Sequence, residues 1–341
     1  MKKIACSALL ASSLLVPFGQ SAFANIPILT IEGEGGGAIV PWAYTSNASK
    51  DGGIGMPAGS IWTWVSDSYT INFWPVAVSI GDRLELGVAY QNLDISTLRS
   101  DLRNDSSSAL DTVLGVANTA RLDADLDNLQ MITAHAKYQF VKESDTWPAM
   151  AVSVSYKKAL DVDELDDNLT GDVRGIAGLA AAPDVLKWMG VDDDDGFEVN
   201  LMATKLWKTK IPLLTAVNLR YTQANQLGFL GFSDDWSLNP EFTLAILPAA
   251  NVAVGVEFRY KPDELKSVND YLTANAGAAG GLLVNTGDLN DYSFKEDHFV
   301  DLFVAYLPTP NLTIAAGVAN IGNVVHRDTK AIWAFNVNYD F

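Results

Sequence analysis

The chain has 341 residues and a formal net charge of −18, with 41 acidic side chains against 23 lysines and arginines. Nucleic-acid binding needs basic patches that neutralise phosphates, so this balance excludes nucleic acid as an expected partner. The only cysteine is Cys6, which leaves no second cysteine for a disulfide. The length suits one β-barrel of roughly a dozen strands of about 10 residues each.

The first 24 residues have the pattern of a secretory signal peptide. Lys2 and Lys3 precede an apolar run, and residues 21–24 (SAFA) have the small-x-small form of a cleavage site. We therefore expect residues 1–24, Cys6 included, to be removed on export. No later stretch offers the about 18 consecutive apolar residues that a membrane-spanning helix needs.

The next segment, residues 25–37, ends in the glycine-rich run GEGGG at residues 33–37. A phosphate-binding loop would need a following helix and usually a lysine, whereas residues 38–45 (AIVPWAYT) have the composition of a strand. We therefore expect residues 25–37 to form a glycine-rich periplasmic segment that leads into the first strand.

From residue 38 the sequence divides into stretches of alternating apolar side chains, which are typical of β-strands. Twelve are predicted, at residues 38–46, 60–79, 83–93, 129–141, 147–158, 196–208, 211–223, 238–248, 251–261, 298–308, 311–320 and 331–341. The alternation of the long second strand shifts at Phe73 and Trp74, beside Pro75, which predicts a β-bulge. Short turns alternate with long connections, as in barrels with periplasmic turns and extracellular loops, and this pattern places both termini in the periplasm.

The last stretch, residues 331–341 (AIWAFNVNYDF), has the clearest strand pattern. Large apolar side chains occupy every second position as far as Phe341, and small or polar ones lie between them. Such a strand turns its apolar side to lipid and its polar side to the lumen, and aromatic rings gather near the ends of barrel strands. The predicted fold is all-β: a transmembrane antiparallel β-barrel of about 12 strands over residues 38–341. It has short periplasmic turns and long acidic extracellular loops, with some helix in residues 108–118 and 183–189.

Residues 32–43 (EGEGGGAIVPWA) are similar to the N-terminal hallmark of a family of Gram-negative outer-membrane proteins that is known only as a domain of unknown function. Further stretches resemble the same family, at residues 82–86, 203–206, 224–228 and 254–263. The resemblance implies a β-barrel in the cell outer membrane. It implies no activity, because the family has none assigned.

The strand faces opposite the apolar ones are expected to line the lumen. Their charged and titratable side chains are Arg83, Glu85, His135, Lys137, Lys157, Glu198, Arg220, Glu241, Glu257, Arg259, Asp301 and Asp340. Five are lysine or arginine and six are acidic, so the interior is nearly balanced in charge. Two interpretations stay open: opposite charges pair and plug the lumen, or they flank a narrow aqueous path. Twelve strands lie between the about 8 of a filled barrel and the 16–18 of an open one.

The long connections carry the negative charge of the chain. Residues 159–195 contain eleven acids and two bases, and end in Asp192, Asp193, Asp194 and Asp195. We expect these four residues to form an acidic outer vestibule that concentrates cations. Bridging by divalent cations and an ordinary solvated acidic surface are the alternatives.

The sequence predicts no enzyme, no cofactor and no metal site. The three histidines, His135, His298 and His326, lack the spacing of zinc ligands, and only His298, near Ser293 and Asp297, hints at a hydrolase. The expected function is a narrow channel for small cationic or neutral polar solutes. The alternative is a non-conducting structural, adhesive or partner-binding surface barrel, plugged by lumen ion pairs and loop helices. Expected partners are outer-membrane lipid, lipopolysaccharide, small solutes, and the barrel-assembly machinery through the C-terminal strand.

Overall fold

The computed structural model describes ten stretches of the chain: residues 28–49, 52–97, 99–100, 125–175, 184–188, 190–224, 226–262, 298–324, 327–328 and 331–341. The predicted signal peptide and the predicted helix at residues 108–118 lie outside them, as does nearly all of the loop at residues 262–297. A search of the described residues found no helix with the length and apolar character to cross a bilayer.

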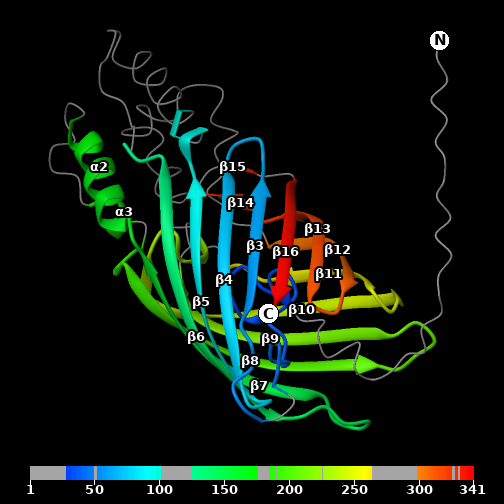
Figure 1. Cartoon of the computed structure of the whole chain (residues 1–341). Helices are drawn as coiled ribbons and strands as arrows, with labels where there is room; N and C mark the ends of the chain where they lie inside the picture. The colour runs from blue at the N-terminus through cyan, green and yellow to red at the C-terminus, as the bar shows by residue number, and fades with distance from the viewer. Residues whose placement is uncertain are drawn as a thin grey trace, which may run out of the picture.

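Twelve antiparallel strands close into one barrel, which confirms the predicted fold class (Figure 1). They are β3 (Ala58–Val65), β4 (Thr70–Ile80), β5 (Leu84–Asp94), β6 (Asn128–Val141), β7 (Ala149–Ala159), β8 (Asp195–Trp207), β9 (Leu213–Ala224), β10 (Phe232–Ala249), β11 (Val252–Arg259), β12 (Phe299–Thr309), β13 (Leu312–Asn320) and β16 (Ile332–Asp340). Each strand pairs with the next one in the wall, and β16 pairs with β3 to close the ring.

The strands alternate between an exposed apolar face and a buried face, as the C-terminal pattern predicts. On β16, Trp333 and Phe335 are 60% and 52% exposed, whereas Asn336 between the outward side chains is 2% exposed. The outer surface is therefore apolar, and the small and polar side chains of this strand point into the barrel.

The number of wall strands agrees with the prediction, but two assignments were wrong. Residues 60–79 are not one bulged strand: they form β3 and β4, joined by a turn. In that turn the hydroxyl of Ser66 accepts hydrogen bonds from the backbone N–H groups of Ser68 (3.2 Å) and Tyr69 (2.9 Å). A serine side chain that bonds to the backbone stabilises a tight turn, which the apolar alternation alone does not reveal.

The second wrong assignment is the predicted strand at residues 38–46. The barrel wall begins at Ala58, and residues 28–43 are buried inside the ring of strands (Figure 1). There β1 (Ile28–Leu29) pairs with β2 (Gly35–Gly36), so this part of the chain doubles back on itself. We call residues 28–46 the inserted hairpin. The segment predicted to lie in the periplasm is therefore inside the barrel wherever the structure describes it.

One end of the barrel has only short connections among the wall strands, whereas the other end has the long connections together with the short Ser66 turn between β3 and β4. The inserted hairpin enters at the short-turn end, where Ile54 bridges to Ile80 and the backbone N–H of Phe341 donates to Pro57. At the other end lie α2 (Val162–Gly175), α3 (Val185–Trp188), the short helix η1 (Gln226–Gly228) and a small hairpin of β14 (Asn323–Val324) and β15 (Arg327–Asp328). Helix α3 lies within the predicted residues 183–189, whereas α2 was not predicted.

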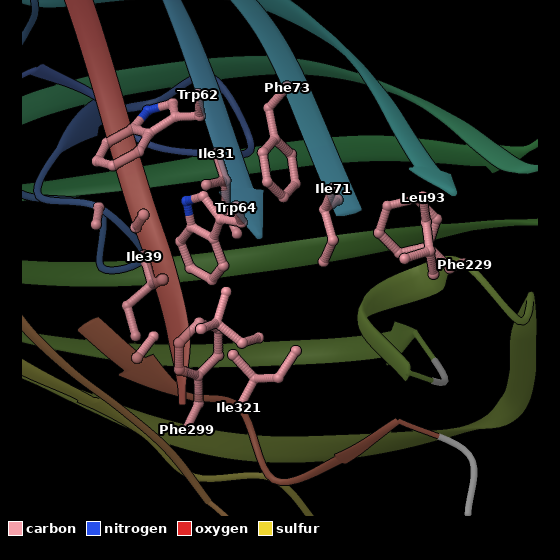
Figure 2. Packing of buried hydrophobic residues seen from close by; sticks show 14 of the residues in the cluster. Ile31, Ile39, Trp62, Trp64, Ile71, Phe73, Leu93, Phe229, Phe299 and Ile321 are labelled. Carbon is pink, nitrogen blue, oxygen red and sulfur yellow. The ribbon is translucent and has the colours of Figure 1, made fainter. Parts of the chain in front are cut away.

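One side of the interior is an aromatic core rather than a polar lumen. Trp64 makes edge-to-face contacts with Phe73 and Phe299, with ring centroids 5.7 and 5.4 Å apart. Figure 2 shows Ile31 and Ile39 of the inserted hairpin among these rings. Strand β3 therefore has large apolar side chains, Trp62 and Trp64, on its inward face as well, where the hairpin packs.

We expect the change Trp64→Ala to destabilise the barrel by about 3–5 kcal/mol, because it leaves a large cavity in this core. The matched control is Trp147→Ala, whose side chain is 66% exposed in the turn before β7 and should change stability by only about 0.5 kcal/mol. Urea unfolding of the protein folded in detergent measures both. Equal effects of the two changes would contradict a packed interior.

Candidate functional site

The interior site centres on Glu32 of the inserted hairpin, whose carboxylate binds three cations of the wall. Its Oε1 accepts a hydrogen bond from Nζ of Lys157 at 2.7 Å. Its Oε2 lies 2.8 Å from Nη1 of Arg220 and 3.3 Å from Nη2 of Arg259. The three cations come from β7, β9 and β11, and all four side chains are buried. Glu32 therefore ties alternate strands of the wall to the hairpin.

Two acids on the intervening strands complete the cluster. Glu198 of β8 pairs with Lys157 at 2.9 Å and also with Arg220. Glu241 of β10 pairs with Arg220 at 2.6 Å and with Arg259 at 2.5 Å. Charges therefore alternate in sign across five adjacent strands, in the order Lys157, Glu198, Arg220, Glu241 and Arg259. We call these five wall residues the charge row.

Glu34 lies two residues further along the hairpin but binds neutral groups. Its Oε1 accepts hydrogen bonds from Ser153 (2.8 Å), Ser155 (3.3 Å) and the amide of Asn200 (3.4 Å). The two hairpin glutamates are thus both buried and differ in their partners: cations for Glu32 and hydroxyl or amide groups for Glu34.

The hairpin backbone also binds two carboxylates of the wall. Glu257 Oε2 accepts the backbone N–H groups of Ala38 (2.7 Å) and Ile39 (2.8 Å). Glu85 accepts the N–H groups of Gly35 (2.9 Å) and Ser46 (2.5 Å). Consecutive backbone N–H groups form a site for an anion where no side chain blocks the approach.

The glycine-rich run exists because of this close approach. A Cβ atom on Gly37 would lie 2.1 Å from Oε1 of Glu257, and one on Gly35 would lie 2.9 Å from Oε2 of Glu85. A Cβ on Gly36 would meet the carbonyl oxygen of Val40 at 2.4 Å. The three glycines therefore let the hairpin backbone reach the wall and fold back on itself.

Two aromatic side chains anchor the hairpin where it leaves the barrel. The indole N–H of Trp42 donates to the hydroxyl of Thr243 at 3.1 Å. The hydroxyl of Tyr44 donates to Glu143, which lies in the turn after β6. Burial, together with this hydrogen bond, raises the pKa of the Tyr44 phenol above its ordinary value, so the hydroxyl stays protonated and remains a hydrogen-bond donor.

A small cavity of about 30 Å³ lies beside Glu32 and the charge row. Its other lining includes Asn239 of β10 and residues 260–262, which follow β11 at the long-connection end. Asn239 is 6% exposed and its Oδ1 has no hydrogen-bond partner. The cavity therefore places an unused acceptor and buried cations together on the side of Glu32 that faces the long connections.

The structure brings most of the predicted lumen residues into the interior. Those that are buried there are Glu85, His135, Lys137, Lys157, Glu198, Arg220, Glu241, Glu257, Arg259, Asp301 and Asp340. Arg83 is the exception: it precedes β5 in a turn and donates to the carbonyl groups of Gln139 (3.3 Å) and Phe140 (3.2 Å). Its position outside the strand explains why alternation misplaced it.

The interior residues do not form one site. Lys137 and His135 lie 2.8 and 3.4 Å from Oε1 of Glu85, separate from the charge row. Asp301 lies opposite Glu257 on the neighbouring strand. Asp340 accepts a hydrogen bond from Asn338 at 3.3 Å. Of the predicted lumen residues, Lys157, Arg220 and Arg259 contact Glu32, and Glu198 and Glu241 pair with these three cations.

The predicted acidic residues of the outer end are partly engaged. Asp194 pairs with Lys158 at 2.6 Å, and Asp195 accepts the hydroxyl of Tyr156 at 2.5 Å. Asp192 accepts the backbone N–H of Asp234 at 3.0 Å. These contacts fix the acidic run beside β10 at the long-connection end.

Glu32 and Glu34 were missed by sequence reasoning, which assigned their segment to the periplasm. A signal was present: two acids and four glycines occur within an otherwise apolar segment. The wall residues that form the charge row also include three cations but only two acids, which leaves one negative charge to be supplied from elsewhere.

We expect Gly37→Ala to loosen the inserted hairpin, because the added Cβ collides with Glu257. In a chain without Cys6, a reporter cysteine at Ile39, which is fully buried, should then react with a maleimide at least about tenfold faster, equivalent to about 1.4 kcal/mol of lost hairpin stability. Gly53→Ala is the control, since a Cβ there meets nothing within 4 Å. Unchanged labelling in the Gly37 variant would contradict the assigned contact.

Comparison with solved structures finds distant barrels. The KdgM porin has 8% identity and a TM-score of 0.45, over 83% of this chain and 99% of that chain. The NanC porin has 8% identity and a TM-score of 0.42, over 84% and 98%. An outer membrane channel from Pseudomonas putida F1 has 9% identity and a TM-score of 0.43, over 84% and 95%. Similarities this distant carry no argument about function.

A comparison with curated proteins found no match. A family model described as "Protein of unknown function (DUF3034)" matches residues 27–338, which include the inserted hairpin and every strand of the barrel wall except the last residues of β16. The chain therefore belongs to the DUF3034 family of proteins of unknown function.

Proposed function

We propose that this protein is an outer-membrane channel for small solutes that its own inserted hairpin closes. The observation that carries the proposal is the binding of Glu32 by Lys157, Arg220 and Arg259. A separate segment thus occupies the polar side of the lumen and is held there by charges. The apolar, ring-bearing outer surface supports placement in a lipid bilayer.

The hairpin is suited to move without unfolding the wall. The barrel closes through β16 and β3, so none of its ladder hydrogen bonds depends on the hairpin. The contacts on the polar side are ion pairs and hydrogen bonds, which water can replace. Buried ion pairs add little net stability compared with apolar packing, although removing one partner is costly. On the polar side of the lumen, displacement of the hairpin therefore exposes polar groups, not apolar ones, to water.

The finer parts of the proposal follow from charge and topology. The acidic outer run Asp192–195 favours cationic or neutral polar solutes over anions. Export through a cleaved signal peptide, contacts with lipid and lipopolysaccharide, and recognition of the C-terminal strand by the barrel-assembly machinery belong to the same proposal. Of the residues that hinted at a hydrolase, His298 packs against Phe258 and Tyr260, whereas Ser293 and Asp297 lie outside the described residues.

A second candidate is a non-conducting barrel that serves as a structural, adhesive or partner-binding surface protein. The aromatic core favours it, because Ile31 and Ile39 are packed among Trp64 and Phe299. Displacing the hairpin loses this apolar burial, which costs about 25 cal/mol for each Å² exposed. The balance between the apolar and the ionic contacts decides between the two candidates.

Glu32→Gln tests the proposal in planar bilayers. The change keeps the shape of the side chain but removes the charge that balances the wall cations, and breaking such a buried pair costs about 3–5 kcal/mol. We expect rare openings in the wild-type protein and frequent openings of the same unit conductance in the variant. Glu34→Gln is the matched control and should resemble the wild type, because its partners are neutral. Folded protein that conducts in none of the three forms would support the non-conducting barrel.

The acidic run should set ion preference once the channel conducts. In the Glu32→Gln background we expect replacement of Asp192, Asp193, Asp194 and Asp195 by asparagine to lower the cation-to-anion permeability ratio. Reversal potentials in a salt gradient measure the ratio. The neighbouring change Asp234→Asn is the control for the loss of a single outer charge. An unchanged permeability ratio would indicate that residues 192–195 are an ordinary solvated surface and do not set ion preference.

A further inference from the structure

We infer that the charge row forms a binding site for a carboxylate, and that Glu32 is its tethered occupant. The idea that a transported solute supplies this carboxylate rests on the proposed channel. The binding site itself does not require conduction.

The charge row carries an excess of one positive charge. Its three cations, Lys157, Arg220 and Arg259, are each at most 2% exposed, and among the described residues they pair with two wall acids, Glu198 and Glu241. The row alone therefore has a net charge of +1. Burying an uncompensated charge costs several kcal/mol, so the wall needs one more anion at this place. Glu32 supplies one, and a single carboxylate from elsewhere has the same charge.

The donors of the row are arranged around both oxygens of one carboxylate. Lys157 contacts one oxygen of Glu32, and the two arginines contact the other, at distances of 2.7, 2.8 and 3.3 Å. Both oxygens of a planar carboxylate are thereby engaged by charged donors, which bind such a group about twice as strongly as neutral donors do. The donors belong to the rigid wall, so they stay in place when the anion changes.

A cavity adjoins the charge row. The cavity beside Glu32 is bounded by residues 260–262, so it lies on the side of the row that faces the long-connection end. The unpaired Oδ1 of Asn239 in the same lining can accept a hydrogen bond from a hydroxyl or ammonium group of that solute. The cavity is small, so a solute enters fully only as it displaces Glu32.

Nearby acids do not fill the site. Glu257 is two residues from Arg259, but its carboxylate is bound by the backbone N–H groups of Ala38 and Ile39. Asp301 faces Glu257 across the strand pair and makes no ion pair with a member of the row in the described residues. As long as the hairpin is in place, removal of the Glu32 carboxylate alone leaves the row short of one negative charge.

Chemical rescue of Glu32→Ala tests the site. The variant removes the carboxylate and makes room for an acetate ion. We expect acetate to raise the apparent melting midpoint of the detergent-folded variant in a saturable way at millimolar concentration. Acetamide, which has the same shape without the charge, should leave it unchanged. Glu34→Ala is the matched control and should not respond to acetate, because its partners are hydroxyl and amide groups. The double variant Glu32→Ala with Lys157→Met should lose the rescue, since its row is already neutral.

An equal response to acetate and acetamide, or an equal response of both alanine variants, would overturn the inference. If Glu32→Ala does not fold alone, the yield of folded barrel is measured in refolding buffer with acetate or with acetamide. A higher yield with acetate supports the site, and equal yields reject it. The readout is stability in detergent, which does not depend on conductance, so the two proposals can fail separately. Rescue by acetate without conductance supports the carboxylate site and rejects the channel. Conductance of Glu32→Gln without rescue of Glu32→Ala supports the channel and rejects the carboxylate site.

Discussion

One carboxylate that does not belong to the barrel wall balances the wall's buried charge. Lys157, Arg220 and Arg259 point inward from alternate strands, and the two acids between them are one too few. Without Glu32 the polar side of the interior would hold an unpaired cation or take up water and ions. The wall and the inserted hairpin are therefore matched in charge as well as in shape, and neither has a well-satisfied interior alone.

The hairpin fits because successive residues serve different sides of the lumen. Ile31 and Ile39 reach the aromatic core, whereas Glu32 reaches the charge row and Glu34 the hydroxyl groups of β7. Ile31, Glu32 and Glu34 lie in the turn between β1 and β2, where the backbone N–H groups of Gly33 and Thr30 donate to the carbonyl groups of Thr30 and Glu34, so one short segment meets an apolar and a polar surface at once. The glycines are needed where the backbone itself, rather than a side chain, contacts the wall carboxylates.

The sequence predicts the barrel well because lipid and lumen impose opposite demands on alternate residues of every strand. Residues 331–341 and the buried row from Lys157 to Arg259 follow this rule, and so their facing was predictable. The rule fails where the inside is not aqueous. Trp62 and Trp64 point inward, so the inward face of β3 is mostly apolar, and the turn at Ser66 was interpreted as a continuation of the strand. Residues 38–46 look like a wall strand because burial inside a barrel selects the same apolar side chains as contact with lipid. A wall strand and a buried inner segment differ in which distant residues they pair with, and the local sequence pattern does not show that pairing.

Under the proposed function, the acidic run at residues 192–195 and the charge row make opposite demands on a solute. The acidic run would repel an anion before it reaches the cavity, whereas the row has a place for one carboxylate. A solute that is neutral overall but carries a carboxylate satisfies both, since a balancing positive group removes the repulsion at the mouth without weakening the ion pairs inside. Closure and selection then depend on the same contacts: the group that displaces Glu32 from Lys157, Arg220 and Arg259 is the group that the site can bind. Under the channel proposal, such a solute would weaken the closure as it binds, and solutes without a carboxylate would leave the hairpin in place.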